Sequence, residues 1–333
     1  MKILYAIQGT GNGHISRARE IIPHLKKHGE VDLVVSGTHT EIGLEEPVKY
    51  RLHGLGFKFG KNGGVDFLAT IKQFRFLRFL YDLKRLPVND YDLIINDFEP
   101  VTSWACKFRG KKNVGLSHQC AYKSPRTPQL KGFHWGKLIL DYYAPSDAYI
   151  GFHFERFDDF INKPVIRREI RNLKISDEGH YTVYLPAYSD EFIFSHTKKM
   201  PDTKWHIFSK HSKEDYSRKN AKVFALDNEK FLQSLASSTG LLTGGGFEGP
   251  AEALFLKKKV LAVPMKNQYE QQCNALGLEK LGVPVVWSED EFGKKLKDWV
   301  ENGKVVPVDF PDETEKIIAD LVAKYGDGKG FEK

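Results

Sequence analysis

Two residues in the first third of the sequence have the types and positions of an acid–base pair. His14 ends the run QGTGNGH directly after a strand-like segment, and Asp97 ends another in INDFEP. Because the carboxyl ends of parallel strands meet at one edge of a sheet, we expect the two side chains to lie close together. An imidazole there can take a proton from a hydroxyl, and a carboxylate on its other ring nitrogen fixes the tautomer. The sequence therefore predicts a catalytic dyad of His14 and Asp97.

Both residues also have structural interpretations, which the sequence leaves open. His14 could simply begin a helix, and Asp97 could cap the helix that Pro100 introduces. Glu99 is then the fallback carboxylate and a candidate contact for a second substrate.

Two loops after predicted strands supply further polar candidates. Gly11, Asn12 and Gly13 follow the first strand, but G-x-G-x-G-H does not match the dinucleotide fingerprint G-x-G-x-x-G. We expect this loop to contact phosphate or the substrate that His14 deprotonates. His118 and Gln119, in GLSHQCAY, follow a later strand and are candidate contacts for the same substrate, although polar loop residues of this kind are common.

Residues 240–275 predict a nucleotide site. The order is an apolar strand, a glycine run, a helix containing Glu252, a second strand and a polar loop. Glycines let backbone N–H groups approach a phosphate, the following helix start favours its charge, and Glu252 can accept hydrogen bonds from ribose hydroxyls. The other candidate donor contacts are Gly244, Gly245, Gly246, Glu270, Gln271 and Gln272.

Strand-like and helical segments alternate along both halves, which predicts an α/β protein with two doubly wound parallel sheets facing each other across a cleft. The predicted strands are Ile3–Ile7, Val31–Val35, Leu93–Ile95, Asn113–Leu116, Tyr181–Leu185, Trp205–Phe208, Val223–Ala225, Gly240–Leu242 and Val260–Val263. The predicted helices are Ile15–Lys27, Pro100–Phe108, Asn228–Ala236, Gly249–Leu256 and Tyr269–Leu281.

The predicted domains are residues 1–165 and 166–325, joined by the Pro-containing, charged stretch Asn162–Arg171. An alternative for the last helix of the second domain is to pack on the first domain. Residues 326–333 (GDGKGFEK) are expected to fray.

The amino-acid composition limits the classes of ligand and partner that we expect. A net charge of +7 suits an anionic ligand such as a nucleotide diphosphate, although ordinary surface charge explains it equally well. Three scattered cysteines and twelve histidines form no metal-ligand spacing, so we expect no metal and no cofactor, and a reducing cytoplasm. Nucleic-acid motifs are absent. No apolar stretch approaches the roughly 18 residues of a membrane-spanning helix, so the chain is soluble or at most peripheral on the inner face of a membrane.

One segment departs from the α/β pattern. Phe67–Leu86 reads as a helix with Lys72, Arg75, Arg78 and Arg85 on one face and aromatic and leucine side chains on the other. The simpler interpretation is a helix packed on the sheet with a solvated basic face. The alternative is a surface that touches anionic lipid headgroups.

Taken together, QGTGNGH and the two later stretches GGGFEGPAEAL and VPMKNQYEQQCNALGLEKLG resemble GT-B nucleotide-sugar glycosyltransferases. That group spans the lipid II-forming N-acetylglucosaminyltransferases and the UDP-glycosyltransferases. The resemblance implies ribose binding by Glu252, six residues after Gly246, and donor phosphates near the glycine run. It also implies sugar contacts from Glu270 and Gln271, with Gln272 beside them, and a general base at His14 that Asp97 orients.

The sequence departs from the plant-type members at two places. Their phosphate-binding histidine is replaced by Gly244, and a glycine-rich loop is replaced by Leu185-Pro186-Ala187-Tyr188-Ser189. The resemblance implies an inverting, metal-independent transfer of a hexose or N-acetylhexosamine from a UDP-sugar to an unidentified acceptor hydroxyl, with a lipid-linked or cell-envelope acceptor as one option. A nucleotide-sugar epimerase or hydrolase, and a catalytically silent nucleotide-sugar-binding protein, stay open as alternatives.

Overall fold

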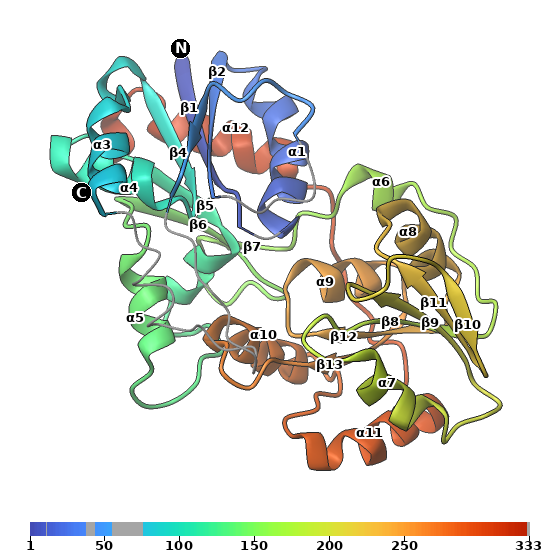
Figure 1. Cartoon of the computed structure of the whole chain (residues 1–333). Helices are drawn as coiled ribbons and strands as arrows, with labels where there is room; N and C mark the ends of the chain where they lie inside the picture. The colour runs from blue at the N-terminus through green and yellow to red at the C-terminus, as the bar shows by residue number, and fades with distance from the viewer. Residues whose placement is uncertain (11, 38–43, 55–75, 332–333) are drawn as a thin grey trace. The chain divides into compact units, whose positions relative to one another are not determined.

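The structure is a computed structural model that describes residues 1–10, 12–37, 44–54 and 76–331. These residues form two compact units (Figure 1). The first unit contains the described residues up to Arg167 together with the C-terminal segment from Pro311, and the second contains Arg168–Phe310. The chain thus enters the second unit inside the stretch predicted to link two domains, and it returns to the first before its last helix.

In the described part of the first unit, a parallel seven-stranded sheet has the order β3-β2-β1-β4-β5-β6-β7. The strands are β1 (Lys2–Gln8), β2 (Glu30–Ser36), β3 (Tyr50–Leu52), β4 (Leu93–Asp97), β5 (Val114–Ser117), β6 (Ala148–Phe152) and β7 (Ile161–Asn162). The strand order reverses between β1 and β4, where Ile7 lies opposite Asp97. Ligands of open α/β sheets bind outside the strand ends at such a reversal.

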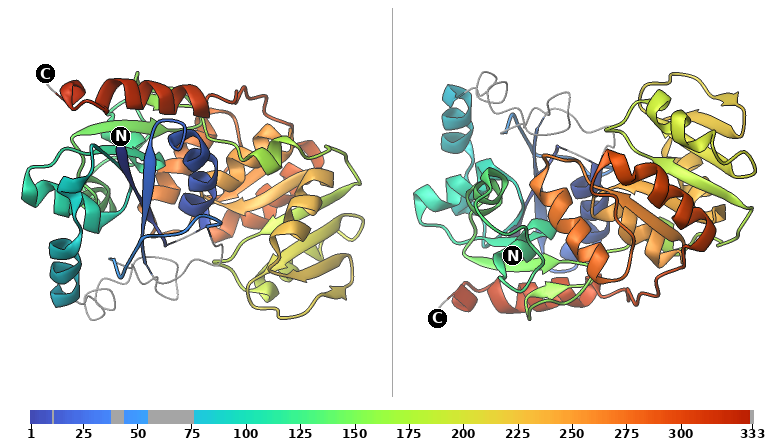
Figure 2. Two further views of the ribbon diagram at one scale, coloured as in Figure 1. Left: turned by 90° about the horizontal axis from the view of Figure 1, so that it is seen from above. Right: turned by 90° about the horizontal axis from the view of Figure 1, so that it is seen from below.

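Helices cover this sheet. They are α1 (Asn12–Leu25), α3 (Phe76–Arg85), α4 (Pro100–Arg109), α5 (Trp135–Tyr142) and α12 (Thr314–Tyr325), with the 3₁₀ helices η1 (Val88–Asp90), η2 (His118–Lys123) and η3 (Lys329–Phe331). Leu83 of α3 and Val101 of α4 join Leu4 and Ile94 of the sheet in one buried apolar cluster. The helix α12 packs against α1, and Figure 2 shows it running along the first unit.

The second unit has, among its described residues, a six-stranded sheet in the order β10-β11-β9-β8-β12-β13. Its strands are β8 (His180–Tyr184), β9 (Lys204–Ser209), β10 (Tyr216–Arg218), β11 (Ala221–Ala225), β12 (Gly240–Gly244) and β13 (Lys259–Val263). Its helices are α6 (Arg168–Arg171), α7 (Asp190–Thr197), α8 (Asn228–Ser237), α9 (Glu248–Phe255), α10 (Tyr269–Lys280) and α11 (Glu289–Asn302). The strand β10 pairs antiparallel with β11, and the other pairings are parallel.

These sheets confirm the predicted α/β class with two doubly wound parallel sheets. The change from the first unit to the second, between Arg167 and Arg168, lies inside the predicted linker Asn162–Arg171. Asn162 ends β7, the segment Arg168–Arg171 forms α6, and Ile170 is fully buried, so much of the stretch belongs to the packed units. The segment expected to fray is described as far as Phe331, whose ring lies 4.9 Å from that of Tyr325.

The segment predicted as one helix, Phe67–Leu86, is described only from residue 76, so Lys72 and Arg75 lie outside the described residues. Within α3, the side expected to pack is largely exposed: Leu77 is 81% exposed, and Phe76 and Tyr81 are about half exposed. Leu83 of the apolar side is buried as expected, and Asp82, which lies on the basic face, is buried as well. The helix therefore presents aromatic, aliphatic and basic side chains to solvent together. In the described ranges, no helix is both long and apolar enough to cross a bilayer.

Candidate active site

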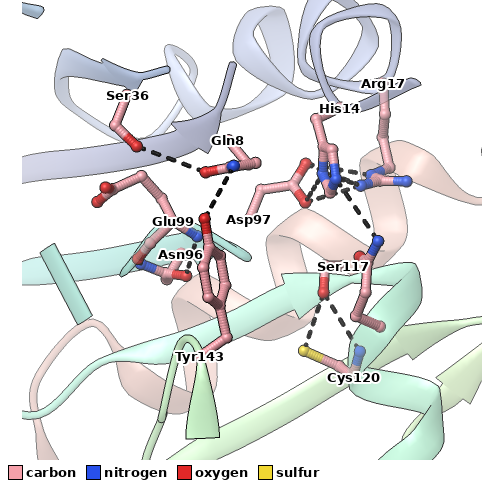
Figure 3. A network of polar contacts seen from close by, with 11 residues as sticks. Gln8, His14, Arg17, Ser36, Asn96, Asp97, Glu99, Ser117, Cys120 and Tyr143 are labelled. Atoms are coloured by element: carbon pink, nitrogen blue, oxygen red, sulfur yellow. Dashed lines mark hydrogen bonds and ion pairs between the residues drawn. The ribbon is translucent and has the colours of Figure 1, made fainter. Parts of the chain in front are cut away.

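His14 and Asp97 form the predicted contact. His14 lies near the start of α1 and Asp97 ends β4, and His14 Nδ1 is 2.8 Å from Asp97 Oδ1 (Figure 3). The Asp97 side chain is fully buried, whereas the His14 side chain is 12% exposed. The carboxylate thus meets the imidazole inside the unit, and the imidazole keeps some access to solvent.

Arg17 completes this contact. Its Nη2 lies 2.7 Å from Asp97 Oδ1 and 3.0 Å from Oδ2, its Nε lies 3.3 Å from Oδ2, and the side chain is 3% exposed. Burial on its own raises the pKa of Asp97, but the charges and hydrogen bonds of Arg17 and His14 bring it below its usual value. Asp97 is therefore ionised at neutral pH and can only accept hydrogen bonds.

The geometry selects one tautomer of His14. Asp97 Oδ1 carries no proton, so the 2.8 Å contact is a hydrogen bond only if His14 Nδ1 donates. Arg17 Nη2 also lies 3.0 Å from Nδ1, and both nitrogens donate to the same carboxylate oxygen. A neutral His14 then has its lone pair on Nε2, the nitrogen turned away from Asp97. This arrangement suits a general base.

Phe98 shapes the turn between Asp97 and α4. Its backbone has a φ of 55°, a left-handed conformation that costs a residue with a Cβ of the order of 1–2 kcal/mol. Its ring lies parallel to that of His14, with ring centroids 6.4 Å apart, and 4.9 Å from the ring of Tyr143. Tyr143 OH accepts a hydrogen bond from Gln8 Nε2 at 3.1 Å. The strained turn thus places an aromatic wall beside the imidazole.

Among the other candidates in the first unit, Gln119 lies beside the dyad. Its Nε2 is 3.5 Å from His14 Nε2, a long contact in which the amide is the donor. The neighbouring candidate, His118, is buried. Its Nδ1 lies 2.8 Å from the carbonyl oxygen of Phe152, and its Nε2 lies 3.3 Å from Tyr122 OH. His118 therefore ties η2 to β6.

Glu99 caps α4, and the suggestion that Asp97 has this role is wrong. The Glu99 carboxylate accepts hydrogen bonds from the backbone N–H groups of Val101 at 2.8 Å and Thr102 at 2.6 Å. Glu99 is fully buried, and its pKa is raised because burial outweighs these bonds. Its oxygens are committed to the start of α4.

Three residues after β1, namely Gly11, Asn12 and Gly13, are predicted to form a loop that contacts phosphate or acceptor. Gly11 lies outside the described residues. Asn12 begins α1, and Gly13 follows it within the same helix.

The glycine run of the second unit lies between β12 and α9. A Cβ atom on Gly245 would stand 2.6 Å from the Gln271 carbonyl oxygen, whereas a Cβ on Gly246 would meet nothing within 4 Å. Gly245 therefore serves close packing against α10, and Gly246 borders open space. The α9 N-cap residue Phe247 makes no side-chain capping hydrogen bond. An anion can approach the backbone here.

Gln271 braces this turn. Its Oε1 lies 3.2 Å from Gly245 N and 3.1 Å from Met265 N and accepts from both. Asn274 Nδ2 donates to the Gly245 carbonyl oxygen at 3.0 Å. Gln272 Nε2 donates to the Lys266 carbonyl oxygen at 2.7 Å. The side chains predicted to contact a sugar at Gln271 and Gln272 thus hold the loops of the site in this structure.

The two carboxylates of the predicted donor site differ in exposure. Glu252 lies in α9 and is 4% exposed, and Glu270 lies in the first turn of α10 and is partly exposed. Both follow strands of the same parallel sheet, β12 and β13, which pair along Gly240–Gly244.

Three residues around the dyad, Arg17, Phe98 and Tyr143, are not among the candidates that the sequence predicts. Arg17 had a usable signal, since it lies three residues after His14 and residues three apart share a helix face. The positive φ of Phe98 and the long-range contact of Tyr143 had none. In the described part of the chain, no group of three or more His, Cys, Asp or Glu side chains is arranged to hold a metal ion.

Comparison of the sequence with protein families identifies the family of this chain, and comparison of its structure with solved structures identifies the fold. The model of the family described as "Glycosyl transferase family 1" matches residues 1–302. No curated protein sequence gives a significant match.

Several solved structures are similar over almost the whole chain. MurG of Acinetobacter baumannii is 12% identical, with 96% of this chain and 95% of that chain covered and a TM-score of 0.52. Arabidopsis thaliana UGT89C1 complexed with UDP is 13% identical, with 97% and 98% covered and a TM-score of 0.53. A UDP-N-acetylglucosamine 2-epimerase is 13% identical, with 98% and 97% covered and a TM-score of 0.51. At these identities the likeness concerns the fold, and it confirms the GT-B class with two Rossmann-like domains.

Proposed function

The chain belongs to glycosyl transferase family 1, and from that premise we propose that this GT-B glycosyltransferase moves a hexose or N-acetylhexosamine from a UDP-sugar to an acceptor hydroxyl with inversion. The observation that carries the proposal is the 2.8 Å contact between His14 Nδ1 and the buried Asp97 carboxylate, which leaves Nε2 as the basic nitrogen. A general base that activates the acceptor hydroxyl suits a single displacement, which inverts the anomeric centre.

His14 Nε2, in the first unit, takes the proton of the acceptor hydroxyl as that oxygen attacks the anomeric carbon. The bond from the anomeric carbon to the phosphate oxygen of the donor breaks in the same step, and UDP leaves with the electron pair. Asp97 stabilises the imidazolium that forms. Gln119, whose Nε2 lies 3.5 Å from His14 Nε2, is the acceptor contact that we retain from the three candidates, because Glu99 and His118 are buried in structural contacts.

The second unit binds the donor. Glu252 accepts hydrogen bonds from the ribose hydroxyls, and Glu270 contacts the sugar hydroxyls. The diphosphate lies at Gly246 and the start of α9, because open space borders Gly246 and helix N-termini stabilise anions. We assign Gln271 and Gln272 to positioning the loops. Phosphate stabilisation by backbone amides requires no metal, so chelators should leave turnover unchanged. UDP as the bound nucleotide is supported by solved structures of this fold that hold UDP.

A thermal-shift screen of nucleoside diphosphates and nucleotide-sugars tests the donor assignment, because ligands of the folded state raise its apparent stability. We expect UDP and one UDP-sugar to raise the Tm and Glu252→Gln to weaken both effects by about 10–100-fold in Kd, the scale of losing hydrogen bonds to a charged group. Glu301→Gln, at an exposed glutamate of α11 in the same unit, is the matched control. A wild-type protein indifferent to every uridine nucleotide would overturn the UDP assignment.

An epimerase on the same fold is the second candidate, because one of the similar structures is an epimerase. An epimerase converts UDP-sugar when no acceptor is present, and a transferase does not. A silent binding protein would convert no sugar in either case. Incubation of the purified protein with donor alone, followed by chromatography of the sugar, separates these functions.

We also propose that α3 contacts an anionic membrane surface, from which a lipid-linked acceptor would be reached. Leu77 is 81% exposed and Phe76 56% exposed, and Arg78 and Arg85 flank the Tyr81 ring at 5.3 and 5.1 Å. Apolar side chains beside cations match the headgroup boundary. Co-sedimentation should be stronger with anionic than with neutral vesicles and should fall for Leu77→Asp. Equal binding to both kinds of vesicle would contradict the proposal.

The three cysteines are buried free thiols, which favours the reducing cytoplasm as the compartment.

A further inference from the structure

We propose that Arg17 is the positioning residue of the site: its guanidinium keeps Asp97 a carboxylate and thereby keeps the His14 proton on Nδ1. The catalytic consequence rests on the proposed function, in which His14 is the general base. The effect on the tautomer does not rest on it.

The contacts of Arg17 are those of a counter-ion built into the fold. The guanidinium lies on both Asp97 oxygens, and Nη2 shares Oδ1 with His14 Nδ1. Arg17 itself is 3% exposed, and its guanidinium carbon lies 5.9 Å from the centre of the Phe152 ring. A cation so enclosed is stable only with its carboxylate, because an unpaired buried charge is expensive. Figure 3 shows the three side chains converging on one point.

The role follows from the burial of Asp97. No part of this side chain is exposed, and burial alone raises the pKa of a carboxyl. The charge of Arg17 is the first of the influences that lower that pKa. Without Arg17, the buried carboxyl is expected to take up a proton.

A protonated Asp97 would reverse the hydrogen bond to His14. Its O–H would donate to the Nδ1 lone pair, and the proton of the neutral imidazole would move to Nε2. His14 would then face the acceptor with an N–H group and could not accept a proton from it. Arg17 thus acts through Asp97 on the nitrogen that performs the chemistry, without touching a substrate.

Nitrogen-15 NMR of the full-length protein labelled at histidine tests this, because the two ring nitrogens of each tautomer differ in chemical shift. The His14 signals are assigned by their absence in His14→Gln. We expect Nδ1–H in the wild type, Nε2–H in Arg17→Gln, and Nδ1–H again in Arg17→Lys, which restores the charge. Arg109→Gln is the matched control: Arg109 also bridges two elements of this unit, through the carbonyl oxygens of Leu83 and Lys84.

Retention of Nδ1–H in a folded Arg17→Gln protein would overturn the proposal. If that variant does not fold, Arg17→Lys decides it: Nδ1–H supports the role of the charge, and Nε2–H refutes it. Once an acceptor is available, kcat should fall by about 10²–10⁴-fold in Arg17→Gln, the scale of general-base catalysis, with KM for the donor unchanged. The NMR measurement requires neither the sugar donor nor the acceptor. The tautomer of His14 can therefore be determined even if the proposed function is wrong, and the two failures are distinguishable.

Discussion

Gln271 Oε1 accepts a hydrogen bond from the backbone N–H of Gly245 at 3.2 Å. This bond spans from α10 to the turn after β12, and it occupies an amide that the sequence suggested for donor phosphate. The amide oxygen also accepts from Met265 N at 3.1 Å. Gln271 therefore sets the shape of the glycine turn, and Gly246 is left as the glycine that borders open space.

Two neighbouring alanine substitutions separate packing from phosphate binding. Gly246→Ala should change the free energy of unfolding by less than about 0.5 kcal/mol, because its Cβ meets nothing within 4 Å, and it should weaken UDP binding at least about tenfold by filling the approach. Gly245→Ala should cost about 1–3 kcal/mol, because its Cβ would stand 2.6 Å from the Gln271 carbonyl oxygen.

Urea unfolding and calorimetric titration with UDP measure these two effects. If Gly246→Ala binds UDP as tightly as the wild type, the diphosphate does not bind at this turn.

Glu99 should behave as a helix cap. Glu99→Ala removes the acceptor of two backbone N–H groups and should lower the free energy of unfolding by about 0.5–2 kcal/mol, measured by urea denaturation. Asp227→Ala, which removes the exposed cap of α8, is the matched control and should cost less. The Glu99→Ala protein that remains folded should retain turnover, and a selective loss of turnover would return Glu99 to the acceptor site.

Stability should fall on mild acidification through His206. Burial, and then the charges of His180 and Lys222, lower the pKa of His206 to about 4 from its usual 6.5. Between these two values the unfolded chain binds the proton and the folded chain does not, so stability is present above pH 6.5 and is lost as the pH falls toward 4. The pKa of His180, stacked on His206 with ring centroids 3.8 Å apart, is lowered in the same direction.

The measurement is the free energy of unfolding from pH 7.5 to pH 4.5 in wild type and His206→Gln. The variant should lose less stability over this range than the wild type. His211→Gln, an exposed histidine of the same unit, is the control. Parallel pH dependences in wild type and His206→Gln would show that His206 does not carry the effect.

The sequence predicted the sheets and the His14–Asp97 contact for the same reason: strand ends of a parallel sheet converge, so residue type and strand position suffice. It also contained enough to place the α4 cap. A proline at the first helical position makes the preceding residue the cap, which selects Glu99 over Asp97.

Other features depend on packing that no local pattern carries. The bond from Gln271 to Gly245 joins residues 26 positions apart. The short strands β3 and β7 have three and two residues and no alternation to detect. In α3 the apolar pattern predicts a packed face, yet Leu77 is exposed because the neighbouring elements cover Leu83 and Asp82 instead.

The central claim is that His14 is the general base of a transfer from a UDP-sugar. The direct measurement is UDP release from the UDP-sugar that binds in the thermal-shift screen, with and without a panel of hydroxyl acceptors, by wild type and His14→Gln. We predict that the wild type releases UDP only with an acceptor. His14→Gln should be about 10²–10⁴-fold slower, with its affinity for UDP unchanged. Equal rates for the two proteins, at equal occupancy by donor, would contradict the account.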